Sequence, residues 1–233
     1  MDLFWSCILP SWPALLLCAV VAYLLGSIST AIIVTRVMGK RDIREMGSGN
    51  AGATNVLRSQ GKTAALLTTV GDLLKSILAV LVGRLILRHL GGGVLSPELL
   101  SLYGAYTAGF FCILGHLYPI FFGFRGGKGI LATLGMMLML DWKVALICLG
   151  IFIVVVLIWR MVSLGSVIAA FSMAVLTWVF RAFVYGQSPQ VVALCTVMAS
   201  IIALLLIYKH IPNLRRIAQG TERKLSFGHT KES

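Results

Sequence analysis

Residues 63–88 read TAALLTTVGDLLKSILAVLVGRLILR, an apolar run with one charged pair, Asp72 and Lys75, near its middle. A helix needs about 20 mostly apolar residues to cross a bilayer. Further apolar segments lie at 12–35, 100–122, 130–140, 144–159, 164–183 and 190–208. Because lipid offers no partner to backbone polar groups, we predict an all-α, polytopic integral membrane protein. It has about seven transmembrane helices in a single domain, residues 1–233.

The composition excludes a soluble domain. Of the 233 residues, 58% are hydrophobic and 12% are charged, whereas globular domains carry about 25% charged residues. The beginning of the chain lacks the pattern of a cleaved signal peptide, and we expect none. The cysteines, Cys7, Cys18, Cys112, Cys148 and Cys195, are scattered through apolar stretches without a CxxC spacing. We interpret them as small buried hydrophobic residues rather than a disulfide framework or a metal site.

Segments 130–140 and 144–159 are short and form either a tight hairpin of tilted helices or a re-entrant pair.

The charge distribution predicts the orientation in the membrane. With the N-terminus outside and seven spans, 15 Lys and Arg residues face the cytoplasm and four face outside. Positive charge favours the cytoplasmic side, so we predict a cytoplasmic C-terminus and cytoplasmic polar loops. A five-span arrangement, in which 130–159 does not cross, gives the loops the same side.

The first polar loop, Gly47–Arg58, reads GSGNAGATNVLR. It contains G-x-G-x-x-G, but a transmembrane segment precedes it instead of a strand, which argues against a dinucleotide site. Closely spaced glycines let backbone N–H groups approach an anion, and Arg58 can bind phosphate through two hydrogen bonds. The alternative is a flexible loop that binds lipid headgroups. The candidate ligands are Gly47, Ser48, Gly49, Asn50, Thr54, Asn55 and Arg58.

The second polar loop contains GHLYP at 115–119 and FRGGKG at 124–129. It is not a Walker A loop, because the glycine spacing differs and Gly129 stands where Ser or Thr would hold magnesium. Its glycines, its lysine and the helix start that follows still favour phosphate. The candidates here are Gly126, Gly127, Lys128 and Gly129. His116 lies within the membrane and is either functional or a structural hydrogen-bonding residue.

The third polar set is His210, Asn213 and Arg216, with Glu222 downstream. The first three lie near one helix face if the helix continues past Pro212, although the proline could also end it. The set forms either a ligand site or a juxtamembrane lipid-binding cluster.

Inside the second apolar run, Asp72 and Lys75 are three residues apart and should neutralise each other. They either support the loops or form a purely structural pair.

Together the three polar sets resemble the bacterial acyl-phosphate:glycerol-3-phosphate acyltransferases (PlsY-type). The pattern GSGNxGATNxxR is matched at 47–58, and GHxxPxxxxFxGGKG at 115–129. The third motif, an HxxN element followed by G-x-E-x-K, is met by His210, Asn213, Gly220, Glu222 and Lys224. The sequence departs from the family at Ser29 and Ser76, where Pro and Gly are expected.

The resemblance implies acyl transfer from acyl phosphate to the sn-1 hydroxyl of glycerol 3-phosphate. This reaction gives lysophosphatidic acid and phosphate, the first step of phospholipid synthesis. It implies a bacterial cell membrane enzyme with a cytoplasmic active site, whose partners are the two substrates and the lipid bilayer. No cofactor, metal or nucleic acid is expected.

The resemblance also assigns roles to residues. Gly126, Gly127 and Lys128 would hold acyl phosphate, and Lys128 would stabilise charge on the leaving phosphate. The implied catalytic residues are Lys128, Ser48, Arg58, His210 and Asn213, of which the last four would bind glycerol 3-phosphate. The implied substrate-binding residues are Gly47, Gly49, Asn50, Thr54, Asn55, His116, Gly126, Gly127, Gly129, Arg216 and Glu222.

The general base stays open. Neither His116 nor His210 has an aspartate four residues on, so the base is His210 or a phosphate oxygen of a substrate. No Ser or Cys has the setting of a nucleophile, so we expect direct transfer. The competing hypotheses are an organic-anion transporter and a phosphate-binding membrane scaffold. An alcohol phosphatidyltransferase would need clustered aspartates to hold metal, and the eight acidic residues are not arranged that way.

Overall fold

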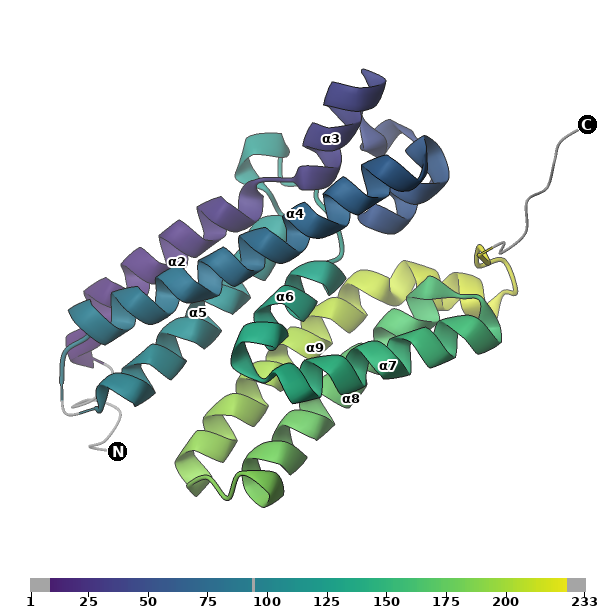
Figure 1. The fold of residues 1–233 in the computed structure, drawn as a ribbon. Helices are drawn as coiled ribbons and strands as arrows, with labels where there is room; N and C mark the ends of the chain where they lie inside the picture. The colour runs from purple at the N-terminus through teal and green to yellow at the C-terminus, as the bar shows by residue number, and fades with distance from the viewer. Residues whose placement is uncertain (1–8, 94, 226–233) are drawn as a thin grey trace, which may run out of the picture. The chain divides into compact units, whose positions relative to one another are not determined.

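The long apolar segments of the sequence form α-helices in the computed structural model (Figure 1), which describes residues 9–93 and 95–225. No strand occurs in these residues, so the all-α prediction is confirmed. The chain divides into two compact units, Met1–Trp142 and Lys143–Ser233, and each is described by itself. The single domain stays a prediction. Cys7 lies outside the described residues, and the cysteines within them are free thiols.

The first unit begins with four α-helices. They are α2 (Trp12–Ser27), α3 (Thr30–Gly39), α4 (Ala53–Leu90) and α5 (Pro97–Leu117), joined by the short helices η2 (Ile43–Glu45) and η3 (Ile120–Phe122). The 3-10 turn η1 (Leu9–Ser11) precedes them, and α6 (Ile130–Leu140) ends the unit. The predicted segment 12–35 is broken at Ile28 and Ser29, whose backbone is extended. Helix α4 is kinked at Gly61, where φ is 85°.

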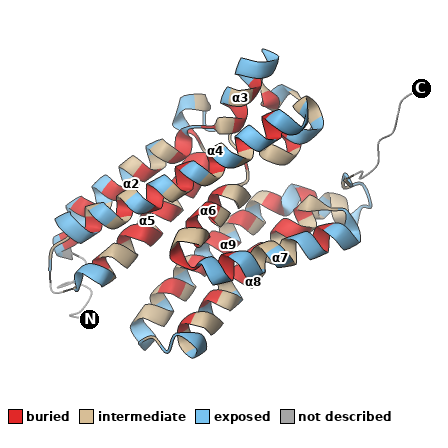
Figure 2. Cartoon of the chain, in the orientation of Figure 1, coloured by how far each residue is buried: buried red, intermediate tan, exposed pale blue. Residues whose placement is uncertain are grey.

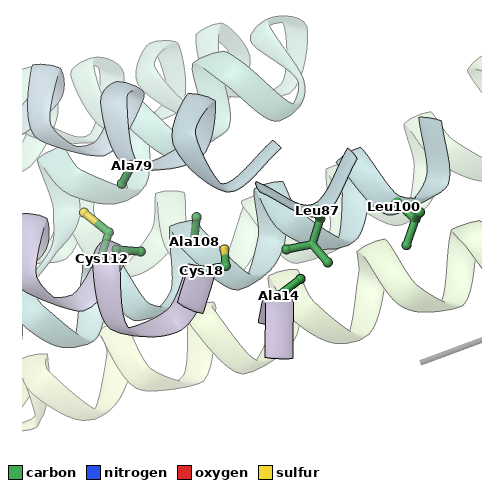
Figure 3. Close-up of a cluster of buried hydrophobic side chains, with 8 residues drawn as sticks. Ala14, Cys18, Ala79, Leu87, Leu100, Ala108 and Cys112 are labelled. Carbon is green, nitrogen blue, oxygen red and sulfur yellow. The ribbon is translucent and has the colours of Figure 1, made fainter. Parts of the chain in front are cut away.

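Small residues let α2, α4 and α5 pack closely. A Cβ atom at Gly104 of α5 would collide with the backbone carbonyl of Gly83 in α4, and one at Gly26 of α2 would collide with the carbonyl of Cys112 in α5. Between the three helices lies a cluster of buried alanines and cysteines with a few leucines (Figure 3). Close backbone approach of this kind is typical of membrane helices, which gain no hydrophobic free energy by leaving lipid.

The outer faces of these helices are apolar. Helix α4 exposes Leu66, Leu67, Val70, Leu74 and Leu78, while the charged pair of the same helix is buried. Figure 2 shows buried and exposed stretches alternating along α4. Apolar side chains outside and paired charges inside suit a helix in a bilayer.

Among the described residues, six helices or helix pairs are long and apolar enough to cross a membrane. The predicted segment 130–140 is the 11-residue helix α6. At about 1.5 Å per residue it spans only about half of the hydrocarbon core. The count of seven spans and the orientation of the termini are therefore not confirmed, whereas the multi-pass character is.

The second unit contains α7 (Trp142–Trp159), α8 (Val162–Val179), the π-helical turn η4 (Phe180–Val184) and α9 (Pro189–Ala218). Helix α8 packs on α9. Helix α9 continues through Pro212, so the proline does not end it. A proline removes one helix hydrogen bond, which membrane helices tolerate. His210, Asn213 and Arg216 therefore share one helix, as the sequence predicted for this case.

We expect Gly104→Ala to lower the melting temperature in detergent, because its methyl group would force α4 and α5 apart. Overpacking of this kind costs about 1–3 kcal/mol, and each kcal/mol lowers Tm by about 2–4 °C in a protein of this size. Gly150→Ala in α7 is the control, because a Cβ atom there meets open space. Equal melting temperatures for the two variants would contradict the close α4–α5 contact.

Candidate functional site

The buried side chain of Asn55 organises the first polar loop. Its Oδ1 accepts a hydrogen bond from the Ser48 N–H at 2.9 Å. Its Nδ2 donates to the carbonyl oxygens of Ile43, Met46 and Asn50 at 3.2, 2.9 and 3.1 Å. The substrate-binding role of Asn55 stays a prediction. In the structure its amide bonds to the loop backbone, so Asn55 shapes the loop that presents the other candidates.

The glycines of this loop adopt backbone angles that favour glycine. Gly47 and Gly49 have φ of 58° and 70°, and a Cβ atom at Gly47 would collide with the Asn55 amide. Gly52 precedes the first turn of α4, where unpaired helix N–H groups favour an anion. Ser48 and Arg58 are exposed, and Asn50 and Thr54 are half-buried. Ser48 and Arg58 thus lie at the surface of the first unit.

The second polar loop folds back on itself. The Gly126 N–H donates to the Leu117 carbonyl at 3.2 Å, and the Gly127 N–H donates to the His116 carbonyl at 3.1 Å. A Cβ atom at Gly127 would collide with the His116 ring and with the backbone carbonyl of Ala51. Since Ala51 belongs to the first loop, Gly127 is the point at which the two loops touch. The structure brings together two motifs that are about 70 residues apart in the sequence.

The half-buried Lys128 directly follows this contact, and Gly129 precedes the first turn of α6. Gly129 has φ of 85°, and its carbonyl accepts from the Thr133 N–H at 2.8 Å. The N–H groups of residues 130–132 therefore lie in the first helical turn, where helix N–H groups have no carbonyl partner within the helix. The lysine and these amides provide positive potential at one place.

A salt bridge that the sequence did not predict holds the segment before the first loop against the second loop. The guanidinium of Arg44 binds the Asp42 carboxylate through Nε at 3.0 Å and Nη2 at 2.8 Å. Its Nη1 donates to the Phe122 carbonyl of the second loop. These hydrogen bonds from Arg44, together with one from Arg36, hold the pKa of Asp42 well below its usual range. The sequence shows only neighbouring opposite charges here, which are common on any surface.

The predicted neutralising pair is confirmed. Lys75 Nζ lies 2.9 Å from Asp72 Oδ1, and both side chains are buried. His116 contacts this pair, because its Nδ1 lies 3.0 Å from Lys75 Nζ.

In the second unit, Glu222 gathers the residues of the third motif. Its Oε1 accepts hydrogen bonds from Asn213 Nδ2 at 2.7 Å and from Ser163 Oγ at 2.6 Å, and its Oε2 accepts one from Arg216 Nε at 2.8 Å. Burial alone would raise the pKa of Glu222, but these hydrogen bonds outweigh it and the pKa is lowered. Glu222 thus anchors the segment after α9 to the start of α8. His210 is buried, and its Nδ1 lies 2.8 Å from the Leu206 carbonyl.

The family was established by comparison with known proteins. A family model described as "Glycerol-3-phosphate acyltransferase" matches residues 16–220. The chain is 42% identical to the glycerol-3-phosphate acyltransferase of Clostridioides difficile, over 92% of this chain and 96% of that protein. The chain belongs to the glycerol-3-phosphate acyltransferase family. The family member of Thiobacillus denitrificans is also 42% identical, with 90% and 96% of the two chains covered.

Two crystal structures of a family member support the fold. The glycerol 3-phosphate form of PlsY (YgiH), an integral membrane glycerol 3-phosphate acyltransferase, is 33% identical and has a TM-score of 0.75, covering 91% of this chain and 96% of that chain. Its lysophosphatidic acid form is 32% identical with a TM-score of 0.72, covering 91% and 95%. The sequence-based assignment to the PlsY-type family is confirmed.

Because Gly127 packs against His116 and Ala51, we expect Gly127→Ala to lower acyltransferase activity by at least tenfold. Gly123→Asn is the control in the same loop: Gly123 has φ of 65°, a Cβ atom there meets open space, and Asn tolerates this backbone region. Initial rates of product formation should separate the two variants. Full activity of Gly127→Ala would show that the contact between the loops does not matter.

We expect Glu222→Gln to lower the melting temperature by several degrees, because glutamine offers an N–H where Arg216 needs an acceptor. The pKa of Glu222 is lower in the folded state. Its stabilising effect is therefore present above the ordinary glutamate pKa of about 4.3 and is lost as the pH falls below it. The difference in Tm between wild type and variant should shrink below about pH 4. Glu98→Gln, at an exposed position, is the control.

Proposed function

We propose that this protein transfers a fatty acyl group from acyl phosphate to the sn-1 hydroxyl of glycerol 3-phosphate. The hydroxyl oxygen bonds to the acyl carbon, the bond from that carbon to the phosphate oxygen breaks, and phosphate leaves. The products are lysophosphatidic acid and phosphate. The reaction takes place at the cytoplasmic face of the bacterial plasma membrane, where the two substrates and the bilayer are its partners.

The observation that carries the proposal is the contact of the two glycine loops beside Lys128. Backbone, lysine and helix start together favour a phosphate. The N–H groups of Gly126 and Gly127 already donate to the carbonyls of residues 117 and 116. These glycines therefore bind acyl phosphate by shaping the loop, and the hydrogen bonds come from Lys128 and the first turn of α6. The related crystal structures of the glycerol 3-phosphate and lysophosphatidic acid forms support the acceptor and the product.

Glycerol 3-phosphate binds through Arg58 and Ser48 in this proposal. Both are exposed, and an arginine can hold phosphate with two parallel hydrogen bonds. His210 and Asn213 of the third motif also bind glycerol 3-phosphate in this proposal. His210 places its Nδ1 against the Leu206 carbonyl. A neutral imidazole that donates from Nδ1 carries its basic lone pair on Nε2, so His210 has the electronic form that a general base needs.

Two effects accelerate acyl transfer. Acyl phosphate is already activated, so holding both substrates in attack geometry removes much of the entropic barrier. Lys128 neutralises the negative charge that grows on the leaving phosphate. Transfer is direct, without an acyl-enzyme.

We expect Lys128→Met to reduce the turnover rate by about 10²–10³-fold, the usual effect of removing one electrostatic donor from a transition state. The melting temperature should stay within a few degrees of wild type. Lys62→Met is the matched control, because Lys62 is exposed on α4 and has no proposed role. Retention of most activity by Lys128→Met would contradict its assignment.

The function itself is tested with purified protein in detergent. The protein receives palmitoyl phosphate with and without glycerol 3-phosphate, and no coenzyme A, carrier protein or metal. We expect phosphate release that needs both substrates and an equal amount of lysophosphatidic acid. Binding of glycerol 3-phosphate without transfer would favour an organic-anion transporter or a phosphate-binding scaffold.

A further inference from the structure

A buried charged cluster in the first unit lies next to the second loop. It consists of Asp72 and Lys75 of α4 and His116 of α5, which are 1%, 6% and 5% exposed. Charged side chains within a span are costly and persist where they are paired or functional. Burying two charges is costly, so a buried ion pair often adds little to stability.

The acceptors around Lys75 match its donors. A lysine ammonium has three N–H donors and no acceptor. Its Nζ lies 2.9 Å from Asp72 Oδ1, 3.0 Å from His116 Nδ1 and 3.0 Å from the Ile28 carbonyl. The Ile28 carbonyl is available because α2 ends at Ser27 and the backbone is extended there. Thr30 Oγ1 completes the cluster by donating to Asp72 Oδ1 at 2.7 Å.

The ammonium of Lys75, at 3.0 Å, is closer to Nδ1 of His116 than Asp72 Oδ1 is, at 3.5 Å, and this favours one tautomer of the ring. Because the ammonium can only donate, Nδ1 of the imidazole accepts, and the proton of a neutral ring is on Nε2. The Nε2 edge faces Gly127, where a Cβ atom would collide with it. The backbone of residue 116 also accepts the Gly127 N–H at 3.1 Å. Gly127 is therefore held by the ring and by the main chain of the same residue.

We propose that Lys75 is a positioning residue for acyl phosphate. By fixing the ring of His116, it holds Gly127 against the first loop and so sets the place of Lys128, the next residue. The inference rests on the proposed function. Loss of a positioning pair should weaken the binding of acyl phosphate alone, the substrate held by residues 126–128. Loss of a merely structural pair has no reason to affect one substrate more than the other.

The test measures kcat and the KM for each substrate in wild type, Lys75→Met and Thr30→Val. For Lys75→Met we expect the KM for acyl phosphate to rise at least tenfold, while the KM for glycerol 3-phosphate stays within twofold. Thr30→Val keeps the shape of the side chain and removes one hydrogen bond to Asp72. Thr30→Val should raise the KM for acyl phosphate by about two- to threefold. If Lys75→Met does not fold, this variant provides the test.

Two further variants separate positioning from stability. Arg84→Met is the matched control: Arg84 is also a basic residue of α4, and its Nη2 donates to the Met139 carbonyl at 2.8 Å. It should lower Tm and leave both KM values unchanged. Adding Asp72→Leu to Lys75→Met removes the uncompensated carboxylate and offers no new hydrogen-bond donor to His116, whose Nδ1 lies 3.5 Å from Asp72 Oδ1. The double variant should recover Tm and keep the raised KM for acyl phosphate.

The inference is overturned if Lys75→Met and Thr30→Val change only Tm, or raise both KM values equally. Recovery of the acyl phosphate KM in the double variant would also overturn it. Failure of the proposed function looks different, because the wild type would then form no lysophosphatidic acid from acyl phosphate and glycerol 3-phosphate.

Discussion

An ammonium group within a span must find its acceptors inside the protein, because lipid offers none. In the first unit, Lys75 meets this constraint with a carboxylate, an imidazole and the carbonyl of Ile28. The Ile28 carbonyl is available to Lys75 because the chain is not helical between α2 and α3. One buried charge thus ties the α2–α3 break, α4 and α5 together. The same interaction orients His116, which contacts the second loop.

Close backbone contact is the second constraint. Between α2, α4 and α5, glycines allow helices to approach until a methyl group would collide with a carbonyl. The polar loops use the same device at Gly127, which fits between the His116 ring and Ala51. Small residues therefore serve packing within the helices and shape the loops at their ends. In the second loop, the N–H groups of Gly126 and Gly127 donate to main-chain carbonyls.

Several side chains that look like ligands in the sequence bind the protein itself. Asn55 holds the first loop through its amide, and Glu222 holds the segment after α9 through its carboxylate. Arg44, which lies in η2 just before the first loop, bonds to Asp42 and to the Phe122 carbonyl of the second loop. These polar groups fix the loops that carry Ser48, Arg58 and Lys128, the side chains that the proposed function assigns to substrate.

The sequence by itself determined the helical membrane fold, the family and the pairing of Asp72 with Lys75. Apolar length, motif spacing and a helical separation of three residues are local properties. It did not determine the break at Ile28 or the hydrogen bonds of the Asn55 amide, because these depend on which distant groups supply hydrogen-bond partners. The contact of Gly127 with Ala51, and of Lys75 with His116, joins residues far apart in the chain. These contacts follow from the packing of α4 against α5 and of one loop on the other. No local sequence pattern encodes a contact between residues so far apart in the chain.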